Sequence, residues 1–254
     1  MTNLMIGYSD IPFFGTALSA PTLGTDYRAA DAHGGARNRT VRLAAAATSS
    51  AWEWETAGAT AVLPQYLFIS RADLIQKKDS APTGWMVEGS DDPFFSTPDV
   101  DDGVFDLGNL AGPRAEDFIV PVTKASAHAY WRVSLTTTAS FKHELSKIFL
   151  GSWLDLDREP IYPAEMTRGS RVAMPRAIPW RFTLDWVGIT DAKIGELTEK
   201  VLKYRDVNPV ILYDSNDLVF PSAFKVLHAY ITGVDVVPQW FNANNLRLEF
   251  EETI

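Results

Sequence analysis

The sequence predicts a mainly β protein, in which a β-sandwich is followed by a second β-rich domain with one short α-helix. Three observations predict this fold class. Short apolar or alternating segments recur along the chain, and turn-forming residues separate them. Only one segment has the apolar spacing of an α-helix. The chain has 254 residues, of which 46% are apolar, so it can bury a substantial core.

The first 50 residues lack this regular apolar spacing. Residues 10–15 are turn-rich, and residues 23–42 are rich in glycine, alanine and polar residues with little periodicity. Such a segment has too few apolar residues for a core of its own and orders against a neighbour. We therefore expect residues 1–50 to form an extended N-terminal arm. Residues 1–15 also lack the charged and then apolar order of a signal peptide, so we expect no export signal.

Residues 51–152 carry the strand signals of the β-sandwich. Residues 130–137 alternate most regularly, because Trp131, Val133 and Leu135 point to one face and the residues between them to the other. With a strand at residues 145–151, this strand is expected to form the closing edge of the sandwich. The other expected strands are residues 51–55, 59–63, 66–69, 84–89 and 117–122, and the expected loops are residues 91–93 and 98–103.

The composition changes after residue 152. Residues 153–179 contain four prolines with arginines between them, which is typical of a linker or a strand-bearing connection. Residues 180–254 are again β-rich, with strands expected at residues 181–186 and 210–213, within 224–236, and at 246–250. We expect this last part to form the second domain.

The one expected helix covers residues 191–204 of the second domain. Thr190 is a suitable N-cap, and Asp191 suits the positive end of the helix dipole. Asn208 and the following proline end the helical segment. The apolar stripe of this helix consists of Ile194, Leu197, Val201 and Tyr204.

Composition and charge exclude several classes of function. The chain has no cysteine, so disulfides and thiolate metal sites are excluded, which fits assembly in a reducing compartment. The net charge of −9 repels phosphate backbones and disfavours nucleic acid as a partner. No apolar stretch is long enough for a transmembrane helix, so we expect no membrane insertion.

The motifs of common enzyme classes are missing from the sequence. It has no phosphate-binding glycine loop, no dinucleotide fingerprint, no Gly-x-Ser-x-Gly and no His-Glu-x-x-His. The four histidines, His33, His128, His143 and His228, are scattered, and none has a metal-binding spacing. We therefore expect a non-enzymatic protein with no catalytic residue, no metal site and no cofactor.

Two groups of residues are weaker candidates for binding. Asp99, Asp101 and Asp102 are close enough in sequence to hold Ca²⁺, although their spacing does not match the helix–loop–helix calcium loop. The alternative is a solvated turn, which we favour for these aspartates.

Tryptophans beside carboxylates give a candidate glycan surface. Trp52 and Trp54 flank Glu53 and precede Glu55, and Trp85 lies in another expected strand. Aromatic rings next to carboxylates suit sugar binding, and paired carboxylates are also the groups that hydrolyse glycosides. The favoured alternative is strand alternation with tryptophan inward and glutamate outward.

The middle of the chain, over about 100 residues, resembles the galactose-binding-like jelly roll, a β-sandwich also called discoidin-type. The resemblance is carried by Trp52-Glu53-Trp54, by residues 59–63, by residues 66–74, by residues 85–92, by Tyr130-Trp131-Arg132-Val133 and by residues 145–151. It implies a jelly-roll fold for residues 51–152. The ligand loops of the family are not identifiable here, so no sugar-binding residue is implied.

Residues 180–254 resemble the ring-forming part of distal tail proteins, which lie at the tail tip of long-tailed bacteriophages. The resemblance is carried by residues 181–186, 191–204, 209–214 and 246–252. It implies a structural component of a tail tip or baseplate that closes into a ring of its own copies. The implied partners are the tube, hub and tape-measure proteins, and the implied location is the virion tail, after assembly in the host cytoplasm.

Two other functions stay open from the sequence. One is a carbohydrate-binding module that contacts host surface glycans, as the jelly-roll resemblance and the three tryptophans suggest. The other is an acidic glycosidase, which we favour least, because no repeat or catalytic signature accompanies the carboxylates.

Overall fold

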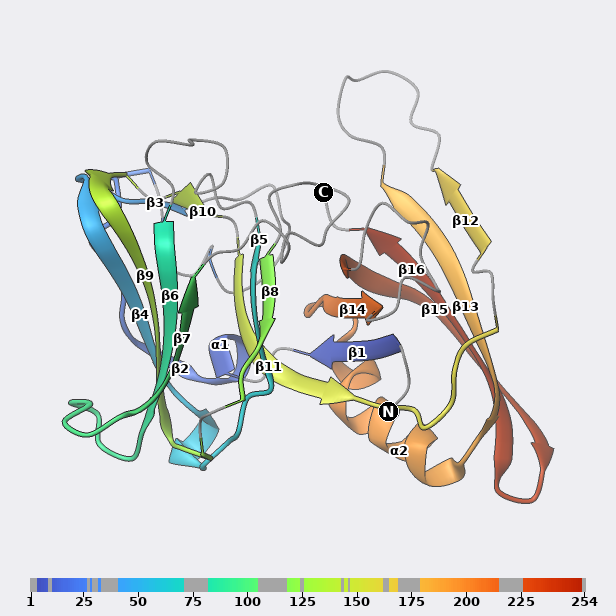
Figure 1. Cartoon of the computed structure of the whole chain (residues 1–254). Helices are drawn as coiled ribbons and strands as arrows, with labels where there is room; N and C mark the ends of the chain where they lie inside the picture. The colour runs from blue at the N-terminus through green and yellow to red at the C-terminus, as the bar shows by residue number, and fades with distance from the viewer. Residues whose placement is uncertain are drawn as a thin grey trace. The chain divides into compact units, whose positions relative to one another are not determined.

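Figure 1 shows the computed structural model of the chain, which divides into two units. The inserted unit is Ser9–Ser152, and the terminal unit combines Met1–Tyr8 with Trp153–Ile254. The inserted unit therefore interrupts the sequence of the terminal unit. The structure describes residues 4–8, 11–26, 28, 32, 41–70, 82–104, 118–123, 126–142, 144–145, 147–161, 165–168, 179–214 and 226–252.

The inserted unit is a β-sandwich of two antiparallel sheets. One sheet has five strands in the order β2-β4-β9-β6-β7, and the other contains β11-β5-β8. The strands of the first sheet are β2 (Thr16–Ser19), β4 (Ala47–Glu55), β9 (Tyr130–Phe141), β6 (Pro82–Ser90) and β7 (Asp99–Val104). Those of the second are β11 (Lys147–Leu154), β5 (Tyr66–Ser70) and β8 (Phe118–Pro121). A further pair joins β3 (Val41–Arg42) to β10 (Glu144–Leu145), and α1 (Ile11–Phe14) is a single turn.

Alternating side chains of the two sheets meet in one core. On β9, Trp131, Val133 and Leu135 are fully buried, which confirms the alternation predicted for this strand. They pack with apolar residues of β4 and β6 and with those of the three-stranded sheet, including Ile69 and Phe118. Burial of these large side chains, each worth about 1.5–3 kcal/mol, is the main force that holds the sandwich together.

Three local expectations for the inserted unit were wrong. No strand forms at residues 59–63: Ala59 ends a 3-10 helix, Ala57–Ala59, in which Gly58 adopts a left-handed φ of 64°, and Val62 makes only an isolated β-bridge to His128. The expected loop at residues 98–103 forms strand β7, although aspartate is uncommon in strands. Strand β9 lies in the middle of its sheet and β11 in the other sheet, so these two strands do not form a closing edge.

The terminal unit contains an antiparallel sheet with the order β12-β13-β16-β15-β14-β1. Strands β13 and β16 alternate buried residues with more exposed ones over most of their length, as a sheet with one solvated face requires, whereas β15 is buried at its start and exposed at its end. The strands are β1 (Leu4–Tyr8), β12 (Glu165–Arg168), β13 (Trp180–Ile189), β14 (Val210–Asp214), β15 (Val226–Trp240) and β16 (Ala243–Glu252).

Helix α2 (Asp191–Lys200) packs on the apolar face of this sheet and is followed by a 3-10 turn, Leu202–Tyr204. Thr190 caps the helix, because its side chain accepts a hydrogen bond from the Lys193 amide at 3.3 Å. Leu197 and Val201 are buried in the core of the terminal unit. The predicted helix is therefore confirmed, with its last turn wound as a 3-10 helix.

The terminal unit corrects the expectation for residues 1–50 and decides between the two alternatives for residues 153–179. Residues Leu4–Tyr8 are not part of an extended arm, because they form β1 and pair with β14, from Leu4 beside Asp214 to Gly7 beside Ile211. Residues 153–179 contain β12, which pairs with β13, so the strand-bearing alternative for this segment is the one found. The pairing of β1 has no local sequence signal, because its partners lie about 200 residues away along the chain.

Candidate interaction face

The outward side of β13, β16 and β15 in the terminal unit is the candidate functional site, and we call it the outer face. It exists because strand side chains alternate, so the residues between the buried ones point to solvent. Its members are Arg181, Thr183, Asp185 and Val187 of β13, Asn245, Arg247, Glu249 and Glu251 of β16, and Thr232, Asp235 and Val237 of β15.

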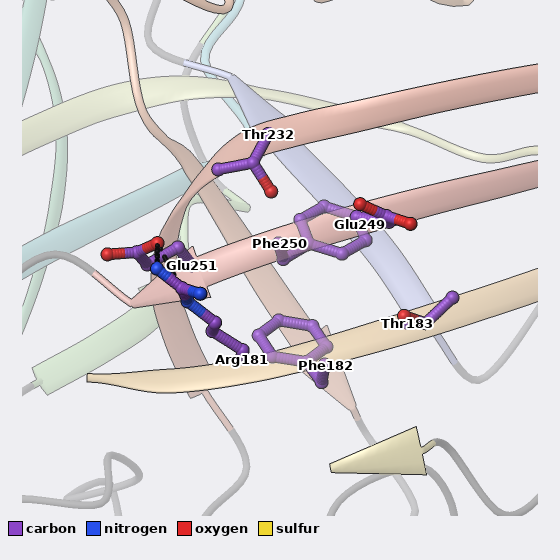
Figure 2. A pocket seen from close by; sticks show the side chains of 7 residues that line it. All are labelled: Arg181, Phe182, Thr183, Thr232, Glu249, Phe250 and Glu251. Carbon is purple, nitrogen blue, oxygen red and sulfur yellow. Dashed lines mark hydrogen bonds and ion pairs between the residues drawn. The ribbon is translucent and has the colours of Figure 1, made fainter. Parts of the chain in front are cut away.

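One end of the outer face is a polar hollow of about 460 Å³. Figure 2 shows its lining side chains, which come from all three strands. Arg181 and Glu251 face each other across β13 and β16, with Nη2 and Oε2 2.8 Å apart. Beneath them the rings of Phe182 and Phe250 stack with centroids 4.9 Å apart. The pair holds this end of the two strands in register.

A glycine makes room for a carboxylate in the polar hollow. Strand β15 bulges between Ile231 and Gly233, and Gly233 lies opposite Glu249. A Cβ added to Gly233 would lie 2.6 Å from Oε2 of Glu249. The bulge and the glycine therefore let the Glu249 side chain lie across the neighbouring strand.

The other end of the outer face is a groove of about 210 Å³, which we call the apolar groove. Ile161, Val187 and Val237 line it, and each is about half exposed. Asp185, Asp235 and Arg247 also line it, and Asp185 and Arg247 form a loose, half-exposed ion pair with Oδ1 and Nε 3.8 Å apart. Three half-exposed branched side chains therefore gather around one hollow of the outer face.

The groove also contains an unpartnered acceptor. The side-chain oxygen Oδ1 of Asn245 is buried and has no hydrogen-bond partner among the described residues. A buried polar atom without a partner costs free energy of about 1–3 kcal/mol. A donor brought in by a bound molecule would recover that cost.

Two aromatic side chains are exposed at the turn that joins β15 to β16, which we call the hairpin tip. Trp240 is 81% exposed and Phe241 is fully exposed. Asn242 closes the two-residue turn with a left-handed φ of 57°, which asparagine tolerates better than most residues. Figure 1 shows this turn as the red end of the β15–β16 hairpin.

The hairpin tip is tied to the start of α2. Asn242 Oδ1 accepts a hydrogen bond from the Asp191 amide at 3.0 Å. Asn244 Nδ2 donates to the carbonyl of Ile189 at 3.1 Å and to Oδ1 of Asp191 at 2.7 Å. The two exposed aromatic rings therefore project from a turn that is held in one conformation.

The tryptophans predicted as glycan contacts are core residues. Trp52, Trp54 and Trp85 are 1%, 0% and 7% exposed and pack between the sheets of the inserted unit. A sugar stacks on an exposed ring, so these three side chains do not present a sugar-binding surface. The alternation with tryptophan inward and glutamate outward holds for Glu53 and Glu55, which lie on the other face of β4.

The three aspartates predicted as calcium ligands have different partners and do not converge on one point. Asp99 pairs with His128, with Oδ2 and Nε2 2.9 Å apart, and buried Asp101 accepts a hydrogen bond from the Thr123 amide at 2.6 Å. Asp102 is exposed on the opposite face of β7. No group of three histidine, aspartate or glutamate residues within the described ranges is arranged to hold a metal ion.

The inserted unit carries an ionic cluster that the sequence did not reveal. Arg132 on β9 lies between Glu53 on β4 and Glu88 on β6, at 3.4 Å from the first and 2.6 Å from the second. The bond to Glu88 raises the pKa of Arg132, with Glu53 adding to the effect. Phe95 covers the guanidinium, with its ring centre 4.5 Å from Cζ.

The loop before β7 holds Phe94 in an exposed position. Asp92 accepts hydrogen bonds from the Ser96 hydroxyl and from the amides of Phe94 and Ser96, and these bonds, that from the hydroxyl most of all, lower the pKa of Asp92. His128 contacts both ends of the loop, since its Nδ1 lies 3.2 Å from Asp91 and its Nε2 pairs with Asp99. Phe94 is 85% exposed beside the buried Phe95.

Comparison of the sequence with protein-family models and with curated proteins found no match. In the part of the chain that the structure describes, no helix is both long and apolar enough to cross a membrane.

Proposed function

We propose that this chain is a structural subunit of the tail tip or baseplate of a long-tailed bacteriophage. In this role it forms a ring with its own copies and connects the tail tube to the hub or to receptor-binding parts. It assembles in the host cytoplasm with the tube, hub and tape-measure proteins and remains in the virion tail. The role is structural, without a catalytic step, a metal or a cofactor.

The observation that carries this proposal is the pair of exposed aromatic residues at the hairpin tip. Leaving Trp240 and Phe241 in water forgoes the free energy of about 1.5–3 kcal/mol that burial of each large apolar side chain provides. Tryptophan and other aromatic residues are the side chains that most often dominate protein–protein interfaces. A tip held by hydrogen bonds to α2 also loses little entropy when it binds.

The oligomeric state tests the proposal. The full chain should form a defined oligomer in analytical ultracentrifugation at micromolar concentration, and negative-stain electron microscopy should show closed rings. A strict monomer over the whole concentration range, with no rings in the micrographs, would count against a ring-forming subunit.

A carbohydrate-binding module that contacts host surface glycans is the second candidate, and Phe94 is the observation that favours it. Its ring is exposed on a loop held by Asp92, and the next residue, Phe95, covers the Arg132 guanidinium. An exposed aromatic ring beside charged hydrogen-bonding groups can stack on a sugar and bind its hydroxyls.

A glycan array tests this second candidate. Binding that is lost in Phe94→Ala and kept in Leu63→Ala would support it, since Leu63 is another exposed apolar residue of the inserted unit. An array without any bound glycan would eliminate it and leave the structural role unchanged.

A further inference from the structure

We propose that the hairpin tip of one copy of this chain docks in the apolar groove of a second copy. The occupant of the groove is thus the Trp240–Phe241 turn of a neighbouring subunit. This inference rests on the proposed function, because it specifies the contact through which the copies assemble. The tip residues Trp240 and Phe241 lie only a few residues from Val237 and Asn245, which line the groove on the same hairpin.

The hairpin tip and the apolar groove have matching chemistry. Trp240 and Phe241 are apolar side chains without a covering neighbour among the described residues. Ile161, Val187 and Val237 surround a hollow of about 210 Å³ and are also about half exposed. Docking would remove both apolar surfaces from water in a single contact.

The hairpin tip is neutral, although the chain as a whole is acidic. The chain has a net charge of −9, so two copies repel each other at most approaches. The segment from residue 237 to residue 246, which includes the whole hairpin tip, contains no charged residue. A neutral tip can enter the groove of a second acidic copy without placing like charges opposite each other.

The groove contains a side-chain acceptor, Oδ1 of Asn245, that lacks a donor among the described residues. Asn245 Oδ1 is buried there without a hydrogen-bond partner in the described structure. The indole N–H of Trp240 is a hydrogen-bond donor with no acceptor among the described residues. Rotation of the Asn245 amide into the groove would let a docked indole donate to Oδ1 and remove the cost of the unpaired oxygen.

The contact joins two different surfaces, so it is directional. Each copy offers one tip and one groove, and a head-to-tail contact of this kind repeats from copy to copy, giving a ring if its rotation closes and an open filament if it does not. A pair of copies can instead exchange tips about a two-fold axis. The number of subunits in the assembly separates these arrangements.

The test uses variants that remove only one of the two surfaces. The tip variant Trp240→Ser/Phe241→Ser changes exposed residues, and the groove variant Val187→Lys/Val237→Lys places two positive charges at the rim of the hollow. Neither double change alters a buried side chain. The control Val207→Lys changes a half-exposed valine elsewhere in the terminal unit.

We expect the tip variant and the groove variant to be monomeric in analytical ultracentrifugation at concentrations where the wild type and the control are oligomeric. Loss of central aromatic anchors should raise the dissociation constant by about 30-fold or more. When the two variants are mixed, each supplies the surface that the other lacks. An equimolar mixture should therefore form a one-to-one heterodimer with one intact contact.

The outcomes separate this inference from the proposed function. A wild-type oligomer that survives both double changes would overturn the tip-in-groove contact and leave ring assembly standing. A wild-type dimer that both changes dissociate would support the contact and overturn the ring. Variants that stay monomeric in the mixture would also overturn the contact, and a monomeric wild type at every concentration would overturn both proposals.

Discussion

Arg132 on β9 donates hydrogen bonds to both carboxylate oxygens of Glu88 on the neighbouring strand β6, at 2.5 and 2.6 Å. This bidentate pair is the strongest geometry that an arginine and a carboxylate adopt. Glu88 is buried, whereas the Arg132 side chain is partly exposed. The pair joins two strands of the five-stranded sheet on the face opposite its core.

Removing this pair should destabilise the inserted unit. Exposed ion pairs contribute about 0–1 kcal/mol and breaking a fully buried pair costs about 3–5 kcal/mol, so Glu88→Gln should cost about 2 kcal/mol. The free energy of unfolding in urea measures the effect. The control is Glu251→Gln, which breaks the exposed pair with Arg181 and should cost less than about 1 kcal/mol. Equal losses in the two variants would contradict the role given to burial.

Asp99 should make the stability of the inserted unit sensitive to acid. Its hydrogen bond with His128, together with bonds from Ser126, lowers the pKa of Asp99. A carboxyl whose folded pKa is lowered stabilises the fold fully above its unfolded pKa of about 3.9. That contribution is lost as the pH falls through the lower folded pKa.

The variant Asp99→Asn should therefore lose less stability than the wild type between about pH 5 and pH 2. Thermal unfolding followed by circular dichroism across that range measures the slope. Asp26→Asn, a change at an exposed aspartate of the same unit, should keep the wild-type slope. If the stability of Asp99→Asn fell with pH as steeply as that of the wild type, the pair of Asp99 and His128 would not contribute to the acid sensitivity.

Two glycines should respond in opposite ways to the same change. A Cβ at Gly89 would lie 2.5 Å from Cδ2 of His128 and 2.8 Å from the buried ring of Trp131, so Gly89→Ala should destabilise by about 1–3 kcal/mol. A Cβ at Gly195 on α2 meets nothing within 4 Å, so Gly195→Ala should stabilise by about 0.5–1 kcal/mol. Urea unfolding of both variants measures the difference in sign.

Thr190 should contribute through its cap alone. Thr190→Ala removes the acceptor for the Lys193 amide and should cost about 1 kcal/mol of unfolding free energy. Thr190→Ser keeps the acceptor and should retain most of the wild-type stability. If the two variants lost the same stability, the methyl group and not the hydroxyl would be the important part of the side chain.

The sequence was sufficient to predict a strand or helix wherever the local spacing of apolar residues matches the side that is buried in the core. Trp131, Val133 and Leu135 alternate at the period of a strand, and burial on one side of a sheet requires that period. The helix start at Thr190 was also predictable, because a capping side chain acts on amides only a few residues away.

The remaining features depend on residues that are distant in sequence. The pairing of Leu4–Tyr8 with β14 depends on contacts across about 200 residues, so no local pattern reports it. The aspartates of β7 form a strand because β6 provides an edge for them, against their own propensity. The exposure of individual tryptophans could not be predicted from the sequence either, since Trp85 is buried and Trp240 is exposed although the residue type is the same.

The insertion of residues 9–152 between β1 and the rest of the terminal unit sets an order for folding during synthesis. Strand β1 leaves the ribosome before the inserted unit, and its partner β14 is made some 200 residues later. The inserted unit is continuous in sequence, so it can fold while β1 still waits for β14. Circular permutation that places β1 after β16 should therefore shorten the loop that folding must close and speed formation of the terminal unit.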